Sequence, residues 1–213
     1  MKKRNNNWWV LVCAAFFILH SSFFISCSED DNTVEEFPNW KETNSKYFNN
    51  LYAEATQRIA SGDTSWKIML NWSLQDSLHL DPENYVIAHV IESGTGTTCP
   101  IFTDSACVMY SGKLLPSQSY PTGYVFDKTY SGDTFQPETS IVRGFLISSS
   151  SLTSGFATVL QYMHVGDRWE VYVPSSLAYG ADGNSSSIPG YSTLIFDMTL
   201  VRFYHAGETT PVE

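Results

Sequence analysis

Residues 152–197 read LTSGFATVLQYMHVGDRWEVYVPSSLAYGADGNSSSIPGYSTLIFD, and this stretch decides the fold. Four apolar residues in its first part recur at positions i, i+3, i+4 and i+7, which is the spacing of a helix with one apolar face. They are Phe156, Val159, Leu160 and Met163. Gly166 and Asp167 interrupt the pattern, so we expect one short helix that ends there.

Strand patterns surround this helix on both sides. The expected strands cover residues 85–91, 106–111, 140–147, 168–173 and 193–204. Alternation is clearest in the last one, where every second residue from Leu194 to Leu200 is apolar and lies on one face. An antiparallel sheet with one short helix packed on it is an α+β domain. We place this domain at residues 85–204, followed by a tail at residues 205–213.

We expect residues 39–84 to form a helical extension ahead of this domain. Residues 40–60 carry apolar side chains on one helical face, and Ser61-Gly62-Asp63 ends the pattern. The face holds Tyr47, Phe48, Leu51, Tyr52, Ala55 and Ile59. Residues 66–74 fit a strand and a packed helical turn equally well. The apolar face suits packing on the domain as well as contact with a second copy, so the oligomeric state stays open.

Residues 1–26 have the order of a lipoprotein signal peptide. A basic start is followed by an apolar run of 12 residues at 8–19, which is too short to span a bilayer. Ser26 before Cys27 resembles the bacterial lipobox, so we expect lipidation of Cys27 and export to the outer membrane, on its periplasmic or its cell-surface face. The acidic residues 27–38 would form a tether similar to the surface-export signal of Bacteroidetes lipoproteins. An ordinary secretory signal or a short membrane anchor is the alternative.

The chain from Cys27 onward is strongly acidic. It holds 9 of the 12 Lys and Arg and all 22 Asp and Glu, which gives a formal charge of −13. This charge argues against nucleic acid as a partner, because phosphate binding needs a basic surface, and against electrostatic attachment to anionic lipid. Cys99 and Cys107 could form a disulfide or remain two separate thiols.

Several kinds of enzyme chemistry find no support in the residues. There is no G-x-S-x-G, P-loop or H-E-x-x-H motif. The histidines after the leader do not have the spacing of metal ligands. They are His79, His89, His164 and His205. We therefore expect neither a metal nor a cofactor.

Aromatic residues and glycines cluster in three segments, at residues 108–112 (VMYSG), 125–127 (VFD) and 152–197. Their order and spacing resemble the FK506-binding-protein (FKBP) family of peptidyl-prolyl cis-trans isomerases, over a little more than half of the chain. The resemblance implies a twisted antiparallel sheet wrapped around one short helix. It also implies a pocket that isomerises X-Pro bonds in proline-containing polypeptide clients, here other exported proteins.

The resemblance assigns roles to ten residues of this pocket. The catalytic ones would be Tyr110, Phe126, Asp127, Phe156, Tyr179 and Phe196, and the substrate-binding ones Leu152, Thr153, Ile188 and Phe145. Phe156 would form the floor, at the start of the helix. Asp127 needs a partner if it is buried, because an unpaired carboxylate is costly to remove from water, and Tyr110 is the expected hydrogen-bond donor.

Some positions depart from the family pattern. Phe156 stands where Trp is usual and Thr153 where an aliphatic residue is usual, while the connections at 115–123 and 128–139 are longer than in the minimal domain. These departures keep an alternative function open, an FKBP-like binding or chaperone module with little isomerase activity.

Overall fold

The computed structural model describes residues 35–74, 81–132, 135–184 and 187–212. The predicted signal peptide, Cys27 and most of the acidic tether lie outside these ranges. From Glu36 onward the chain forms one compact unit, with a hydrophobic core of its own. Such a unit has the properties of a domain that folds independently.

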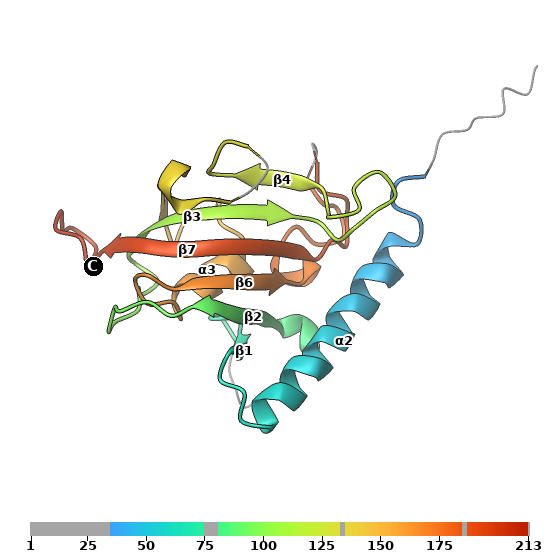
Figure 1. Cartoon of the computed structure of the whole chain (residues 1–213), viewed down its shortest axis with the longest axis horizontal. Helices are drawn as coiled ribbons and strands as arrows, with labels where there is room; N and C mark the ends of the chain where they lie inside the picture. Colours follow the sequence, from blue (N-terminus) through green and yellow to red (C-terminus); the bar gives the residue numbers. More distant parts are fainter. Residues whose placement is uncertain (1–34, 75–80, 133–134, 185–186, 213) are drawn as a thin grey trace, which may run out of the picture. The chain divides into compact units, whose positions relative to one another are not determined.

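Among the described residues, seven strands form one antiparallel sheet (Figure 1). They are β1 Trp66–Leu70, β2 Tyr85–Glu92, β3 Ser105–Lys113, β4 Val125–Lys128, β5 Arg143–Leu146, β6 Arg168–Val173 and β7 Leu194–Tyr204. Their order is β1-β2-β6-β7-β3-β4, and β5 also pairs with β3. Three short 3₁₀ helices lie between strands, η1 Pro82–Asn84, η2 Pro137–Thr139 and η3 Ser175–Leu177. The α+β class expected from the sequence is confirmed.

The short helix α3 Ser154–Leu160 lies behind the sheet in Figure 1, and its residues from Gly155 to Leu160 are all buried. Thr153 precedes the first helical residue, and its side chain accepts a hydrogen bond from the Phe156 N–H at 3.4 Å, so Thr153 caps the helix. The expected extension to Gly166 is wrong. The N–H groups of Gln161 and Tyr162 bond three residues back, which tightens and ends the helix. Met163 is still fully buried, but it projects from the turn that follows.

The long helix α2 Trp40–Ala60 has the bounds expected from the sequence. Its buried residues are Trp40, Asn44, Phe48 and Ala55, and it contacts β1 and η1. The apolar face of α2 therefore packs on the domain, which is one of the two roles expected for it. Ile59 was expected on this face but is 40 % exposed, because it lies in the last turn, beside the exposed residues that end the helix.

The observed strands differ from the expectation in several places. Residues 66–70, left open between strand and helix, form β1 and pair with β2. The strand expected at 140–147 is shorter, because η2 and an isolated bridge from Tyr130 to Ser140 precede β5. In β7 an irregularity in the pairing with β3 near Leu200 shifts the alternation, so that Phe203 becomes the next fully buried residue.

Neither a bilayer-spanning helix nor a metal site is found in the described ranges. No helix there combines the length and the apolar character that crossing a membrane requires. In the same ranges, no three or more His, Cys, Asp and Glu side chains gather where they could hold a metal ion. Cys99 and Cys107 are both free thiols.

Candidate functional site

A pocket of about 140 Å³ opens beside the start of α3, on the inner face of the sheet. Its lining residues are Tyr110, Phe126, Asp127, Arg143, Phe145, Ser151, Leu152, Thr153, Phe156, Tyr179, Leu194 and Phe196. Nine of the ten residues singled out from the sequence are among them. The fold thus brings together side chains from four strands, one helix and two loops that are up to 86 positions apart in the chain.

Three aromatic rings pack edge to face around Phe156. Its ring centroid lies 5.2 Å from that of Phe196, and 5.7 Å from those of Tyr110 and Phe145. Phe126 extends the cluster, with its ring 5.7 Å from Phe196. Edge-to-face pairs at such distances are favourable beyond the apolar area that they bury, so floor and walls form one rigid aromatic surface.

Gly112 on β3 makes room for two of these rings. A Cβ atom at this position would lie 2.6 Å from Phe126 Cζ and 2.7 Å from Phe196 Cε1. Any side chain at Gly112 would therefore push one of the two rings out of place. The glycine is needed for a close approach of side chains, not for an unusual backbone angle.

One polar network crosses the aromatic surface. The Tyr110 hydroxyl donates to Asp127 Oδ2 at 2.5 Å, and Arg143 Nη1 donates to the same oxygen at 2.9 Å and to the Tyr110 hydroxyl oxygen at 2.6 Å. Burial, followed by the hydrogen bond to Asp127, raises the pKa of Tyr110 well above its ordinary value of 10.0. Tyr110 is therefore a neutral hydrogen-bond donor at any physiological pH.

The sequence reasoning missed Arg143. Its position depends on long-range pairing, because β5 joins β3 with Arg143 opposite Val108. A local signal was present, however. Arg143 and Phe145 are two residues apart in a strand and so point to the same face, and Phe145 was already a candidate wall residue.

The rim of the pocket is formed by loops. Tyr179 follows η3 and is 41 % exposed, while Leu152 and Thr153 precede α3. Among the described residues, no protein acceptor bonds the Thr153 N–H. Ile188 is not among the lining residues. It is 2 % exposed, and its own N–H bonds to Asn184 Oδ1 at 2.7 Å.

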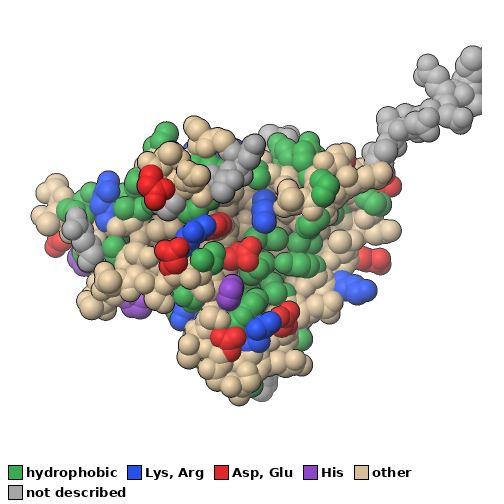
Figure 2. All heavy atoms as spheres, viewed as in Figure 1, with side chains coloured by type: hydrophobic (Ala, Val, Ile, Leu, Met, Phe, Trp, Pro, Cys, Tyr) green, Lys and Arg blue, Asp and Glu red, His purple; other side chains and the backbone are tan. Residues whose placement is uncertain are grey.

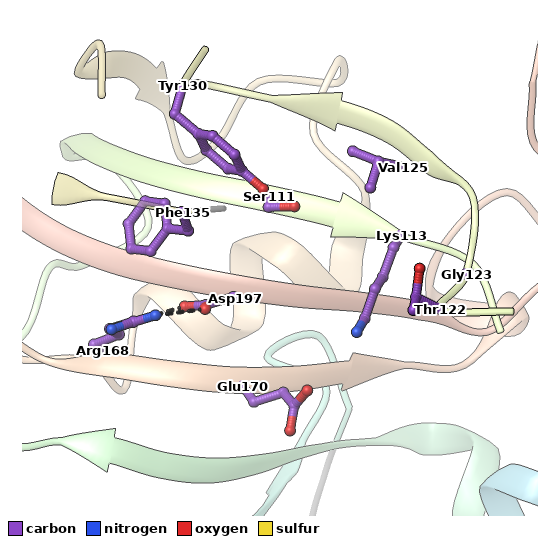
Figure 3. A pocket seen from close by; sticks show the side chains of 10 residues that line it. All are labelled: Ser111, Lys113, Thr122, Gly123, Val125, Tyr130, Phe135, Arg168, Glu170 and Asp197. Carbon is purple, nitrogen blue, oxygen red and sulfur yellow. Dashed lines mark hydrogen bonds and ion pairs between the residues drawn. The ribbon is translucent and has the colours of Figure 1, made fainter. Parts of the chain in front are cut away.

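A second hollow, of about 300 Å³, lies on the opposite, outer face of the sheet (Figure 3). Its lining residues are Ser111, Lys113, Thr122, Gly123, Val125, Tyr130, Phe135, Arg168, Glu170 and Asp197. Arg168 holds Asp197 through two hydrogen bonds, of 2.9 and 2.8 Å. Figure 2 shows acidic and basic side chains gathered over the middle of the sheet on this face. None of the residues singled out from the sequence lies here.

Comparison with known proteins gives a consistent result. Residues 100–201 match the family model described as FKBP-type peptidyl-prolyl cis-trans isomerase. The chain is similar to the macrophage infectivity potentiator of Trypanosoma cruzi, with 32 % identity over 126 residues, covering 58 % of this chain and 55 % of that protein. It is also similar to the FKBP-type 22 kDa peptidyl-prolyl cis-trans isomerase of Escherichia coli K12, with 36 % identity over 113 residues (53 % and 47 %).

Two further matches are to another bacterial protein and to a solved structure. The chain is 35 % identical over 112 residues to the outer membrane protein MIP of Legionella longbeachae, covering 53 % of this chain and 41 % of that one. A crystal structure of a peptidyl-prolyl isomerase from Pseudomonas syringae pv. tomato has a TM-score of 0.52 at 23 % identity, covering 78 % of this chain and 96 % of that one. This last likeness shows the fold alone. The chain spans about half the length of the curated relatives that it matches.

Proposed function

We propose that the chain catalyses cis-trans isomerisation of X-Pro bonds in exported polypeptides, on the premise that residues 100–201 match the FKBP-type peptidyl-prolyl cis-trans isomerase family. The observation that carries the proposal is the aromatic pocket beside α3, which gathers nine of the ten predicted residues. The relatives named as isomerases support it.

The size and lining of the pocket suit a proline side chain. Its volume of about 140 Å³ is well below the ~300–1,000 Å³ of sites for drug-sized ligands. Six of the lining residues are aromatic, and Phe156 at the floor is 5 % exposed. A compact apolar ring can enter such a space, whereas a charged or long side chain would lose its hydration there.

The chemistry asks little of the protein beyond a favourable environment. Rotation about the X-Pro amide has a barrier of ~18–20 kcal/mol, because the twisted state loses amide resonance. The twisted amide is less polar than the planar one, so a site that excludes water disfavours the planar state more than the twisted one. Each tenfold acceleration needs about 1.4 kcal/mol of such a difference. No bond is made or broken.

Two groups at the rim are suited to hold the carbonyl groups that flank the proline. The Thr153 N–H has no protein acceptor among the described residues, and the Tyr179 side chain is half-exposed at the mouth. Thr153 keeps this role although it replaces an aliphatic residue, because its hydroxyl is used to cap α3. The Tyr110–Asp127–Arg143 network fixes the opposite wall, since each of the three residues is bonded to the other two.

A direct test is an isomerase assay on residues 36–213, the compact unit. The cis fraction of a proline tetrapeptide is followed in real time with and without protein. We expect clear acceleration over the spontaneous rate, which has a time constant of tens to hundreds of seconds. A folded protein that gives no acceleration would contradict the isomerase and leave a binding or chaperone module as the function of the pocket.

We also propose that a lipid on Cys27 anchors the protein to the outer membrane, where its clients would be other exported proteins. The order of basic start, short apolar run and Ser26-Cys27 supports this, as does the name of the Legionella longbeachae relative. Stable anchoring needs more than one acyl chain. Mass spectrometry of the membrane fraction should find a lipidated Cys27 peptide, and Cys27→Ser should release the protein into the soluble fraction. A wild-type peptide without lipid would refute the anchor.

A further inference from the structure

The segment of residues 188–193 leads directly into β7 and ends next to a wall residue of the pocket, Leu194. It is also tied to the other side of the pocket mouth, because the Tyr191 N–H donates to the Gly180 carbonyl oxygen at 2.8 Å. Gly180 follows Tyr179, the exposed wall residue. The geometry of this segment therefore sets the distance between two walls of the pocket.

The backbone of this segment is held in an unfavourable conformation. Tyr191 has a φ of 63°, in the left-handed region that residues other than glycine rarely adopt. Such a conformation persists only where surrounding contacts fix it. Some part of the molecule must therefore supply those contacts.

Helix α2 supplies them, although it lies about 150 positions earlier in the chain. The Trp40 Nε1–H donates to Ser192 Oγ at 2.8 Å, and Asn44 Oδ1 accepts a hydrogen bond from the Thr193 N–H at 2.7 Å. Lys41 Nζ lies 4.6 Å from the centre of the Tyr191 ring. Three consecutive residues of the segment are thus contacted by one turn of the helix.

The two hydrogen bonds that Trp40 and Asn44 make with this segment are buried. Asn44, Ser192 and Thr193 are each 2 % exposed. The Asn44 amide is oriented by its own Nδ2, which donates to the Trp40 carbonyl oxygen at 2.8 Å, and the Ser192 hydroxyl donates onward to the Pro189 carbonyl oxygen. Apolar residues could fill the same space, but hydrogen-bond donors and acceptors at fixed positions specify a single position for the backbone of residues 188–193.

We propose that α2 is a brace for the pocket and that Trp40 and Asn44 are positioning residues for substrate binding. They fix residues 188–193, and through these residues the separation of Tyr179 and Leu194. The proposal rests on the proposed function, because the effect on substrate requires that the pocket binds proline. Losing the brace should weaken binding of the ground state and the transition state alike, which raises KM and leaves kcat nearly unchanged.

The test uses the full chain with two variants that break the brace, Asn44→Ala and Ser192→Ala. Asn50→Ala is the matched control, because Asn50 is an exposed asparagine of the same helix. Ala55→Gly controls for stability, because it weakens the helix about three turns away from Asn44. NMR exchange measurements on a proline tetrapeptide give KM and kcat, and hydrogen exchange gives the protection of the Tyr191 and Thr193 amides.

We expect Asn44→Ala and Ser192→Ala to raise KM at least threefold, with kcat within twofold, and to speed amide exchange at Tyr191 and Thr193 at least tenfold. Neither control should change KM or this exchange beyond what its loss of stability explains. The brace would be overturned if the rise in KM of Asn44→Ala were no larger than Ala55→Gly shows for the same loss of stability. It would also be overturned if amide exchange at Thr193 were unchanged in Asn44→Ala. If the wild type does not isomerise the peptide, the proposed function fails, and the exchange rates alone then support or overturn the positioning of residues 188–193.

Discussion

Two hollows lie back to back on the same strands, and their chemistry separates them more clearly than their size. β3 and β7 give Tyr110 and Phe196 to the inner pocket, and the very next residues, Ser111 and Asp197, to the outer hollow. The outer hollow is the larger, at about 300 Å³ against about 140 Å³. A choice by volume alone would place the isomerase site in the outer hollow, whereas the chemistry of the lining residues places it in the inner pocket.

The difference teaches what an isomerase site needs. Two acidic and two basic side chains line the outer hollow, where the guanidinium of Arg168 is already engaged by Asp197 and stacked on the Phe135 ring. Charged side chains such as these remain hydrated, so the outer hollow cannot remove water from a bound amide. The inner pocket confines its charged side chains to one hydrogen-bonded network, and six of its twelve lining residues are aromatic. The predictions below therefore pair each change in the pocket with a matched change elsewhere.

The largest effect is expected from the floor. Phe156→Ala should lower kcat/KM by roughly 10- to 100-fold, or about 1.4–2.8 kcal/mol of transition-state stabilisation, because it removes the ring against which three other rings pack. It should also cost about 3–5 kcal/mol of stability, so circular dichroism must first show that the variant is folded. Phe135→Ala in the outer hollow should leave kcat/KM within twofold. An equal loss in both variants would break the comparison between the two faces.

The next effect concerns the carboxylates. Asp127→Asn should lower kcat/KM by roughly tenfold, about 1.4 kcal/mol, because it removes the charge that holds Arg143 and Tyr110 together. Asp197→Asn removes an ion-paired carboxylate of the same chemistry from the outer hollow and should leave activity unchanged. Its effect should be on stability, at about 0–1 kcal/mol for a partly exposed pair. Isomerase assays and urea denaturation on both variants check the two outcomes.

The third effect is on ring positions. Gly112→Ala should lower kcat/KM by roughly three- to fivefold, below 1 kcal/mol, because the new Cβ would meet the rings of Phe126 and Phe196. Gly144→Ala is the control from the neighbouring strand, since its Cβ would find only Cys107 Sγ, at 3.8 Å. An unaffected Gly112→Ala variant would show that the two rings need not be in these positions.

Fold and site were predictable to different degrees, for physical reasons. Helix α2 was placed to the residue, because one apolar face and a glycine turn define its bounds. The end of α3 was misplaced, because Met163 is buried and the apolar period therefore continues beyond the last helical hydrogen bond. The apolar period in a sequence indicates which residues are buried, and here burial extends to Met163, beyond the end of the helix at Leu160. β1 could not be assigned, since a short, mostly apolar segment fits both kinds of element.

The pocket was predictable where it depends on local motifs and unpredictable where it depends on pairing between distant strands. The residues near α3 and on β3, β4 and β7 were identified by their order and spacing. Arg143 was missed because its place beside Tyr110 comes from the pairing of β5 with β3, across a loop of unusual length. The brace from α2 was invisible for the same reason. Nothing in the sequence near Asn44 indicates a bond to Thr193.

The smallest predicted effect is on pH dependence. Burial raises the pKa of Tyr110 above the ordinary 10.0, so the folded chain resists an ionisation that the unfolded chain undergoes near that value. This contribution to stability is fully present below about pH 10 and is lost as the pH rises above it. Between about pH 9 and about pH 11, the free energy of unfolding should therefore fall less steeply in Tyr110→Phe than in the wild type. Equal slopes in urea titrations would contradict the buried, neutral phenol.

The most direct test of the difference between the two faces is to map where a proline tetrapeptide binds. In an NMR titration of residues 36–213, the backbone amides of Thr153, Phe156 and Leu194 should shift progressively with peptide. Those of Ser111, Arg168 and Asp197 should shift much less, although two of them are sequence neighbours of pocket residues. The largest shifts around Arg168 and Lys113, with Thr153 and Phe156 unmoved, would place the peptide in the outer hollow and contradict the assignment of the inner pocket as the isomerase site.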